Sequence, residues 1–279
     1  MEIFITRAET QAYLAGLRSL GKSIGFVPTM GALHQGHLSL VEAARRKTDV
    51  VVCSIFVNPT QFNDKKDLEN YPRPLEDDIR KLREANCAVL FLPEVAEMYQ
   101  SHDEWHIELN NLDTVLEGEI RPGHYQGVTQ IVKKLFDIIE PDYAFFGQKD
   151  YQQFMVISYM VEKLGISVEL IQCPIVREND GLAMSSRNVY LSPPDRKNAL
   201  ALFKSLTQAK EKFETETVSQ IKLNALAFLG SSPGIEPEYF EILDASTFQA
   251  ISNKTTQRII ALVAARVGGI RIIDNMMLK

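Results

Sequence analysis

Short β-rich runs alternate with helical patterns over the first two-thirds of this 279-residue chain, and this alternation constrains its fold more than any other feature. Val50–Phe56 is a continuous apolar run, typical of a strand buried on both faces of a parallel sheet. We expect strands at 23–27, 50–56, 88–92, 143–146 and 168–172, and helices at 10–20, 38–46, 77–85, 127–139 and 151–164. Strands separated by helices of this length form βαβ units with right-handed crossovers. The sequence therefore predicts an α/β, doubly wound parallel sheet with ligands outside the carboxyl ends of its strands.

The pattern changes after Val176. Two helical patterns, 195–213 and 218–229, precede three β-rich runs at 239–243, 258–267 and 270–273. Helices followed by strands joined through Gly and polar turns predict a smaller α+β domain. We therefore expect two domains, residues 1–176 and residues 177–279.

Composition and charge exclude several classes of protein. With 45% hydrophobic residues and only 15 Gly and 12 Pro, the chain does not resemble a disordered or low-complexity protein. A net charge of −6 argues against a protein that coats nucleic acid, although it leaves room for a local basic pocket. The first residues lack the pattern of a signal peptide, and no run approaches the ~20 apolar residues of a membrane span.

The three cysteines favour a reducing compartment. Cys53, Cys87 and Cys173 are far apart in the sequence, and each lies in or beside an apolar run, as buried thiols do. No pair has the spacing of zinc ligands. We therefore expect a cytoplasmic, enzyme-sized protein, with neither nucleic acid nor membrane as a partner.

The strand expected at 23–27 runs into the decapeptide Pro28–His37, which carries two histidines directly before a helix. His34 and His37 are three positions apart, so they share one face of the first helical turn with its unpaired N–H groups and positive dipole end. Gly36 leaves space for a bulky anion or a nucleotide ring to approach the backbone. The pattern predicts an anion site with two tunable donors, suited to phosphates that gain charge in a transition state.

Other interpretations of these motifs are weaker or stay open. Two histidines can be metal ligands, but no third ligand lies at helical spacing, and they can also be ordinary surface histidines. Gly16–Ser23 matches the phosphate-loop pattern, but there a helix precedes the motif and a strand follows it, the reverse of the order that the loop requires. Gly21 fits better as the residue that ends that helix.

Further polar residues follow expected strands or lie in loops. Lys149 lies just beyond the strand at 143–146, where it can act as a point charge on phosphate or be a solvated turn lysine. Asp150, beside it, can cap the next helix. Met184–Arg187 combines two hydroxyls and a guanidinium in a loop, which suits a phosphate clamp. Asp77 and Asp78 are an open candidate pair for binding Mg²⁺ or its waters, with Asp77 the tentative ligand; adjacent acids at a helix start are as often dipole partners.

Together these segments resemble the HxGH signature of nucleotidylyltransferases and class I aminoacyl-tRNA synthetases, and more closely the pantothenate synthetase (pantoate–β-alanine ligase) family. Five blocks occur in the order seen in that family, namely Pro28–His37, Phe56–Phe62, Tyr71–Arg73, Gly147–Gln153 and Met184–Asn188. The resemblance covers nearly the whole chain, and the five blocks together are highly specific. One departure is Gln148, where many family members carry Glu; its neighbours match, so we expect the same class of reaction.

The resemblance implies a Rossmann-like, homodimeric ligase of pantothenate (coenzyme A precursor) biosynthesis. It would condense (R)-pantoate with β-alanine through a pantoyl adenylate. ATP would be consumed, with Mg²⁺ as the cofactor, and AMP and pyrophosphate would be released. Residues 1–176 would bind ATP and pantoate, residues 177–279 would act as a lid, and Asp150 would accept from ribose hydroxyls. His34, His37 and Lys149 would be catalytic, with His37 the better proton donor. The ATP-binding set would be Met30, Gly31, Ala32, Leu33, His34, Gln35, Gly36, His37, Gly147, Gln148, Lys149, Asp150, Val176, Met184, Ser185, Ser186 and Arg187.

For the acid substrate the resemblance points to two amides. Gln61 and Gln153 would bind pantoate, and Gln61 would also meet β-alanine; an amide can bind a carboxylate without neutralising the nucleophile. Glu117 and His124 lie in a matching segment whose role the sequence does not reveal. Two rival functions remain open: another superfamily member, either a nucleotidylyltransferase or a small aminoacyl-tRNA synthetase relative, and a non-catalytic nucleotide sensor.

Overall fold

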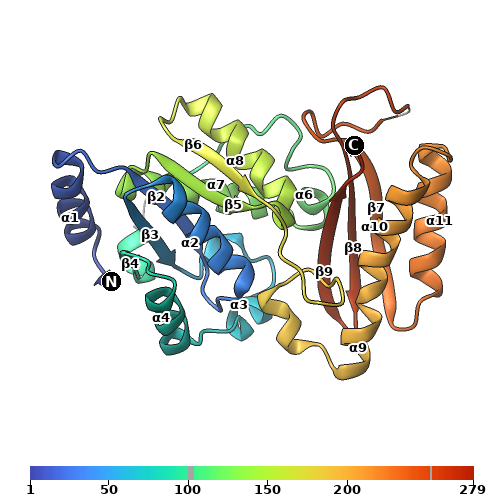
Figure 1. Cartoon of the computed structure of the whole chain (residues 1–279), viewed down its shortest axis with the longest axis horizontal. Coiled ribbons are helices and arrows are strands. Elements are labelled where there is room, and N and C mark those ends of the chain that lie inside the picture. The colour runs from blue at the N-terminus through green and yellow to red at the C-terminus, as the bar shows by residue number, and fades with distance from the viewer. Residues whose placement is uncertain (100–103, 252) are drawn as a thin grey trace. The chain divides into compact units, whose positions relative to one another are not determined.

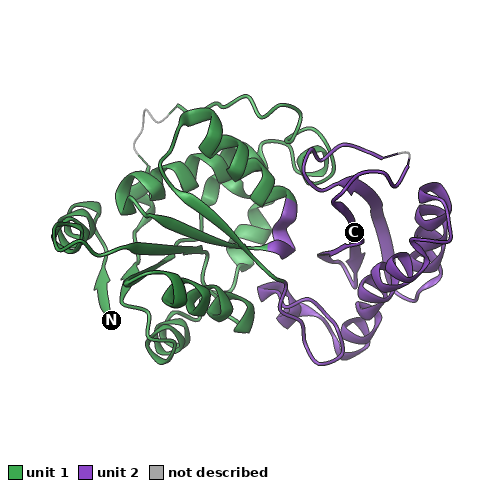
Figure 2. Ribbon diagram, turned by 45° about the horizontal axis from the view of Figure 1, so that its top comes forward, with its two compact units in different colours: residues 1–147, 152–174 green, residues 148–151, 175–279 purple. Residues whose placement is uncertain are grey.

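The computed structural model describes residues 1–99, 104–251 and 253–279, which form two compact units (Figure 2). The N-terminal unit comprises residues 1–147 and 152–174. The C-terminal unit comprises residues 175–279 together with 148–151, a short segment between the last residue of one strand and the body of the following helix. The chain therefore contributes a piece of its first two-thirds to the second unit.

A parallel sheet of six strands forms the centre of the N-terminal unit (Figure 1). Its strands are β1 (Glu2–Phe4), β2 (Ile24–Thr29), β3 (Val50–Ile55), β4 (Val89–Phe91), β5 (Tyr143–Gly147) and β6 (Glu169–Cys173). Their order in the sheet is β1-β4-β3-β2-β5-β6. Because β2 leads outward to β3 on one side and β5 lies on its other side, the order reverses at β2, where doubly wound sheets bind ligands.

Helices cover both faces of this sheet. The helices of the unit are α1 (Arg7–Ser19), α2 (Gln35–Lys47), α3 (Lys65–Asn70), α4 (Leu75–Glu84), α5 (Val95–Met98), α6 (Glu117–Ile120), α7 (His124–Ile139) and α8 (Tyr151–Leu164), with a short 3₁₀ turn η1 (Pro59–Gln61). Side chains alternate between faces along a strand, so Phe26 packs into a core with α1, α7 and α8, while the adjacent Val27 packs with α2 and α4. The continuous apolar runs of the sequence are explained by this burial on both faces.

The C-terminal unit is built on an antiparallel sheet in the order β7-β8-β9. Its elements are the 3₁₀ turns η2 (Gln148–Asp150) and η3 (Ser186–Tyr190), the helices α9 (Pro193–Asn198), α10 (Leu200–Lys212) and α11 (Val218–Ser231), and the strands β7 (Ile235–Asp244), β8 (Ile259–Val267) and β9 (Ile270–Met277). Helices α10 and α11 lie side by side against the sheet (Figure 1) and share with it a core that includes Leu206, Phe240 and Val263.

The expected fold class is confirmed: a doubly wound parallel sheet is followed by a smaller α+β part. The single helix expected at 195–213 is wrong, because α9 ends at Asn198 and α10 begins at Leu200. Ala199, which is fully buried, is both the C-cap of α9 and the N-cap of α10, and neither Gly nor Pro marks the change. The short elements β1, α3, α5 and α6 were not expected. Among the described residues, no helix combines the length and apolar character needed to cross a membrane.

Candidate active site

The turn between β2 and α2 carries the decapeptide that the sequence singled out. Gly31 and Ala32 adopt left-handed backbone conformations, with φ of 82° and 49°, so the chain reverses sharply before the helix. Gly31 N–H donates to Thr29 Oγ1 (3.2 Å), and Thr29 Oγ1 donates to the Ser54 carbonyl on the neighbouring strand (2.7 Å). A Cβ at Gly31 would lie 3.0 Å from Ile55 Cγ2, so this close turn favours glycine.

Asp78 of α4 fixes the same turn from the other side. Its two carboxylate oxygens accept hydrogen bonds from the backbone N–H groups of Ala32 and Leu33, each at 2.7 Å. The side chain is almost fully buried, and burial raises the pKa of its carboxyl, while the two N–H donors act in the opposite direction. Lys81, also on α4, forms a third hydrogen bond to this turn, since its Nζ donates to the Leu33 carbonyl at 2.6 Å.

His34 and His37 both use Nδ1 within their own helix. His34 caps α2, and its Nδ1 accepts from Gly36 N–H (3.1 Å), while His37 Nδ1 accepts from His34 N–H (3.3 Å). The ring centroids are 4.1 Å apart. An accepting Nδ1 assigns the proton of each neutral imidazole to Nε2, so both rings carry their donor on that nitrogen. The helix starts at Gln35 rather than at the expected Leu38 because His34 supplies this cap.

Gln61 is oriented by a chain of fixed donors and acceptors. The Gly127 carbonyl can only accept, so Asn58 Nδ2 must face it (3.1 Å), and the same Nδ2 donates to Gln61 Oε1 (3.1 Å). Tyr99 O–H donates to Asn58 Oδ1 at 2.6 Å, which agrees with this orientation. The Gln61 amide therefore presents its NH₂ end toward Met30, whose Sδ lies 3.1 Å from Nε2. Met30 and Gln61, predicted separately, are brought together.

His124 and Arg121, at the start of α7, hold the backbone of Gln61. His124 Nδ1 donates to the Gln61 carbonyl at 2.8 Å, and Arg121 donates both to His124 Nε2 (3.1 Å) and to that carbonyl (3.4 Å). Because the guanidinium can only donate, His124 is neutral with its proton on Nδ1. This contact gives His124 a structural role that the sequence did not reveal.

Glu117 and the two glutamines of α8 lie elsewhere in the N-terminal unit. Gln152 accepts from Glu117 N–H (3.1 Å) and donates to the carbonyls of Leu112 and Val115 (2.8 Å each), so its amide ties α8 to the segment before α6. Gln153, the predicted pantoate residue, is the half-buried neighbour on α8.

The two acidic candidates for a metal site have other partners. Asp77 accepts from Arg80 (2.5 Å) and Lys81 (2.6 Å), and these bonds lower the pKa of its carboxyl. Asp78 uses both oxygens on the turn before α2. Within residues 1–99, 104–251 and 253–279, no group of three or more His, Cys, Asp or Glu side chains is placed to hold a metal ion.

Gly147 is the last residue of β5 in the N-terminal unit, and the predicted residues that follow it, Gln148 to Asp150 and Val176 to Arg187, belong to the C-terminal unit. Lys149 lies in η2, between Gln148 and the exposed Asp150. Val176 accepts from Met184 N–H at 3.1 Å, which brings these two predicted positions together. Ser185 Oγ accepts from Arg187 N–H (3.3 Å) and caps η3, so the serines and the arginine share one tight turn.

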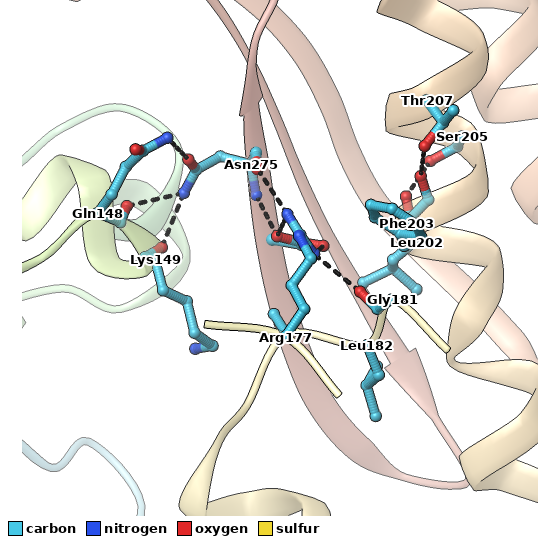
Figure 3. Close-up of polar contacts among 12 residues, drawn as sticks. Gln148, Lys149, Arg177, Gly181, Leu182, Leu202, Phe203, Ser205, Thr207 and Asn275 are labelled. Atoms are coloured by element: carbon cyan, nitrogen blue, oxygen red, sulfur yellow. Dashed lines mark hydrogen bonds and ion pairs between the residues drawn. The ribbon is translucent and has the colours of Figure 1, made fainter. Parts of the chain in front are cut away.

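Gln148 and Lys149 are held by a residue that the sequence did not single out. The side chain of Asn275, on β9, donates to both of their carbonyls (Figure 3). Asp78 and Asn275 act on residues distant in sequence, so a local pattern did not reveal these contacts. Asn58 contacts both the nearby Gln61 and the distant Gly127.

Comparison with known proteins gives one consistent result. The family model described as pantoate-beta-alanine ligase matches residues 2–277. The pantothenate synthetase of Bacteroides thetaiotaomicron is 45% identical over 280 residues, covering 100% of this chain and 99% of that protein. The pantothenate synthetase of Thermotoga petrophila is 47% identical over 280 residues, with 100% of both chains covered.

Solved structures agree with the sequence relatives. The crystal structure of pantothenate synthetase from Thermus thermophilus superposes with a TM-score of 0.94 at 41% identity, covering 100% of this chain and 99% of that one. The pantoate-beta-alanine ligase of Francisella tularensis, crystallised with beta-gamma ATP and beta-alanine, has a TM-score of 0.82 at 32% identity, with 100% and 98% coverage.

Proposed function

The chain belongs to the pantoate–β-alanine ligase family and is an enzyme of that class, and from this premise we propose how its residues carry out the reaction. The match of the family model to residues 2–277 carries the assignment. The reaction forms a carbon–nitrogen bond between (R)-pantoate and β-alanine at the expense of ATP, and its product is pantothenate.

We propose two chemical steps. A pantoate carboxylate oxygen attacks the α-phosphorus of ATP, the bond from that phosphorus to the β-bridging oxygen breaks, and pyrophosphate leaves. The β-alanine amine then attacks the carbonyl carbon of the pantoyl adenylate, the carbonyl–oxygen bond to phosphate breaks, and AMP leaves while the nitrogen loses a proton. No protein nucleophile is required, so positioning and charge stabilisation supply the rate.

His34 and His37 would stabilise the charge that develops between the α- and β-phosphates. Their Nδ1 atoms are engaged by the backbone, which fixes the rings and places the proton on Nε2 of each. The N-terminus of α2 adds a positive dipole end at the same place. His37 is the better candidate for the proton donor. The ATP site would begin with Met30, Gly31, Ala32, Leu33, Gln35 and Gly36.

Residues of the C-terminal unit, together with Gly147 at the end of β5, would bind the rest of the nucleotide. Lys149, Ser185, Ser186 and Arg187 would hold the β- and γ-phosphates, and Gly147, Gln148, Asp150, Val176 and Met184 would line the ribose and adenine. In the part of the chain that the structure describes, Lys149 Nζ has no hydrogen bond or ion pair, which leaves the ammonium available to a ligand. We propose that residues 177–279 close as a lid and keep water from the adenylate.

Gln61 and Gln153 would bind pantoate, and Gln61 would also meet β-alanine. The oriented amide of Gln61 supports this role, because its NH₂ end supplies donors for a carboxylate or a hydroxyl. Neutral donors leave the carboxylate its charge and therefore its nucleophilicity.

Mg²⁺ would accompany ATP, bound chiefly through phosphate oxygens, as is usual for this ion. Asp77 and Asp78 do not fit a cage for the ion, since Asp77 is paired with two cations and Asp78 with two backbone N–H groups. When bound, the ion would neutralise phosphate charge. We further propose that the enzyme is cytoplasmic and forms a homodimer. Light scattering on the purified protein tests the dimer.

Measuring AMP and pyrophosphate from ATP and pantoate, with and without β-alanine, tests the function. We expect steady AMP release only when β-alanine is present, and without it no more than about one pyrophosphate per active site. A product that retains the nucleotide would identify a nucleotidylyltransferase instead. ATP binding without pantoate-dependent pyrophosphate release would identify a nucleotide sensor.

A further inference from the structure

Both polar atoms of the Asn275 side-chain amide, on β9, form hydrogen bonds with the turn that carries Lys149. Its Nδ2 donates to the carbonyls of Gln148 and Lys149, each at 2.9 Å, and its Oδ1 accepts from Gln148 Nε2 at 3.1 Å (Figure 3). Asn275 is only 1% exposed, so water does not compete for these groups. An amide offers two donor hydrogens, and here both are committed to the backbone of η2.

An ion pair holds Asn275 in turn. Arg177 donates to both oxygens of Asp274, at 2.6 and 2.9 Å, and its Nη2 also reaches the Asn275 carbonyl at 3.2 Å. Asn275 N–H donates to Asp274 Oδ1 at 2.8 Å, so the guanidinium and the carboxylate fix the backbone of Asn275 between them. A bidentate pair of this kind sets orientation as well as energy.

The far side of Arg177 is also anchored. Its Nη1 donates to the Gly181 carbonyl at 3.0 Å, and its guanidinium lies 4.6 Å from the ring centroid of Phe203, on α10. A Cβ at Gly181 would lie 2.2 Å from Phe203 Cδ1, so this close packing requires glycine, whose φ is 100°. The contacts thus run without a break from a core helix to η2, all within the C-terminal unit.

We propose that Asn275 is a positioning residue for Lys149: it fixes the backbone from which the lysine extends, and the Arg177–Asp274 pair fixes Asn275. This inference rests on the proposed role of Lys149 in ATP binding. A lysine side chain is flexible and does not fix its own ammonium in space. The position of the Lys149 backbone therefore decides which region the ammonium can reach. Figure 3 shows the Lys149 side chain extending away from the Gln148–Asn275 contact, with its main chain held there.

A double-mutant cycle on the full-length enzyme tests the proposal. In Asn275→Ala we expect kcat/KM for ATP to fall about 10- to 100-fold, as for other small misplacements of a catalytic group, and the ATP Kd measured by calorimetry to rise. The KM values for pantoate and β-alanine should stay within about twofold. In a Lys149→Ala background, Asn275→Ala should add less than about a twofold further loss, because residues that act through one another are not additive.

Two control variants separate positioning from general destabilisation. Ile272→Val trims the core of the C-terminal unit on the same strand, and should leave all kinetic constants unchanged. Arg177→Lys keeps a cation beside Asp274 but loses the paired donors, so it carries the test if Asn275→Ala does not fold. In Arg177→Lys we expect kcat/KM for ATP to fall less than in Asn275→Ala, and to fall little further once Lys149 is replaced by Ala.

The outcomes distinguish failure of this inference from failure of the proposed function. If Lys149→Ala retains normal use of ATP, the proposed role of Lys149 is wrong. If Lys149→Ala is impaired while Asn275→Ala and Arg177→Lys behave like the wild type, Lys149 acts but Asn275 does not position it. The inference is overturned if Asn275→Ala lowers kcat/KM for ATP by the same factor in the wild type and in the Lys149→Ala background. The role of Asn275 would then be purely structural. Arg177→Lys is judged in the same way if it replaces Asn275→Ala.

Discussion

The imidazoles of His34, which caps α2, and of His37, in its first turn, each have Nδ1 occupied by backbone, so the neutral ring carries its proton on Nε2. For His37 this separation allows the two functions of the ring to be removed one at a time. The Oδ1 of asparagine reaches the position of Nδ1 and can still accept from His34 N–H, whereas the amide nitrogen of glutamine reaches the position of Nε2 and can still donate.

We predict that His37→Asn keeps the free energy of unfolding within about 1 kcal/mol of the wild type, because the helix cap survives. Adenylate formation should fall about 100- to 1,000-fold, the usual loss for one donor to a developing charge. His37→Gln should retain more activity and less stability. Pantoate-dependent pyrophosphate release and urea unfolding measure both, and the opposite ranking of the two variants would remove Nε2 from the mechanism.

The buried cysteines give a prediction about thiol reactivity. Burial raises the pKa of all three thiols, and that of Cys87 to about 11. The thiolate is the reactive form, so at pH 8 only about one Cys87 thiol in a thousand is ionised. We expect Ellman's reagent to find no fast-reacting thiol in the native protein at pH 8 and three after denaturation. A rapid native reaction would contradict the buried environment of these residues.

Single residues also show where sequence analysis stops. The HxGH motif identified His34 and His37 because the histidine spacing and the helix start are local. Asp78 was considered for a metal because it neighbours Asp77, but its partners lie 45 and 46 positions earlier. Asn275 acts on residues 126 and 127 positions away, a contact that only the fold creates.

At the scale of elements, apolar periodicity predicted the sheet well because its strands are buried on both faces. The strand expected at 143–146 is β5 (Tyr143–Gly147), and the helix expected at 151–164 is α8. Elements with weak or absent local signals were missed. β1 is a three-residue edge strand, and the break between α9 and α10 falls at an alanine, the residue that most favours helix.

Helix α7 provides an element-scale prediction, because it approaches η1 closely at a glycine. A Cβ at Gly127 would lie 2.4 Å from the Thr60 carbonyl oxygen, too close for either backbone to remain in place. Gly127→Ala should therefore move η1, raise the KM for pantoate about tenfold through Gln61, and lower stability by roughly 1–3 kcal/mol. Pantoate kinetics and urea unfolding provide the measurement.

A matched control exists in α1. Gly16 is also helical, and a Cβ there meets nothing within 4 Å. Gly16→Ala should raise stability by about 0.5–1 kcal/mol, through the higher helix propensity of alanine, and leave KM unchanged. If both variants change stability in the same direction, close packing at Gly127 is not what requires its glycine.

For the whole molecule, the informative feature is that each unit has its own hydrophobic core. Residues from α1, α7 and α8 pack on one face of the parallel sheet and residues from α2 and α4 on the other, while α10 and α11 pack on the antiparallel sheet. Separate cores allow the two units to respond separately to a ligand. An adenylating ligase has a reason to use such freedom, because an acyl adenylate exposed to water hydrolyses.

We therefore predict that ATP with pantoate slows hydrogen exchange in the turn η3, which contains Ser186 and Arg187, by about tenfold or more. Mass spectrometry of peptides covering residues 184–190 measures it, with β3, already buried in the sheet, as an internal reference. β-Alanine alone should have no effect, since it brings no phosphate to be held. Unchanged exchange at η3 with ATP and pantoate both saturating would show that this turn does not close on the nucleotide, and would leave water exclusion to the N-terminal unit.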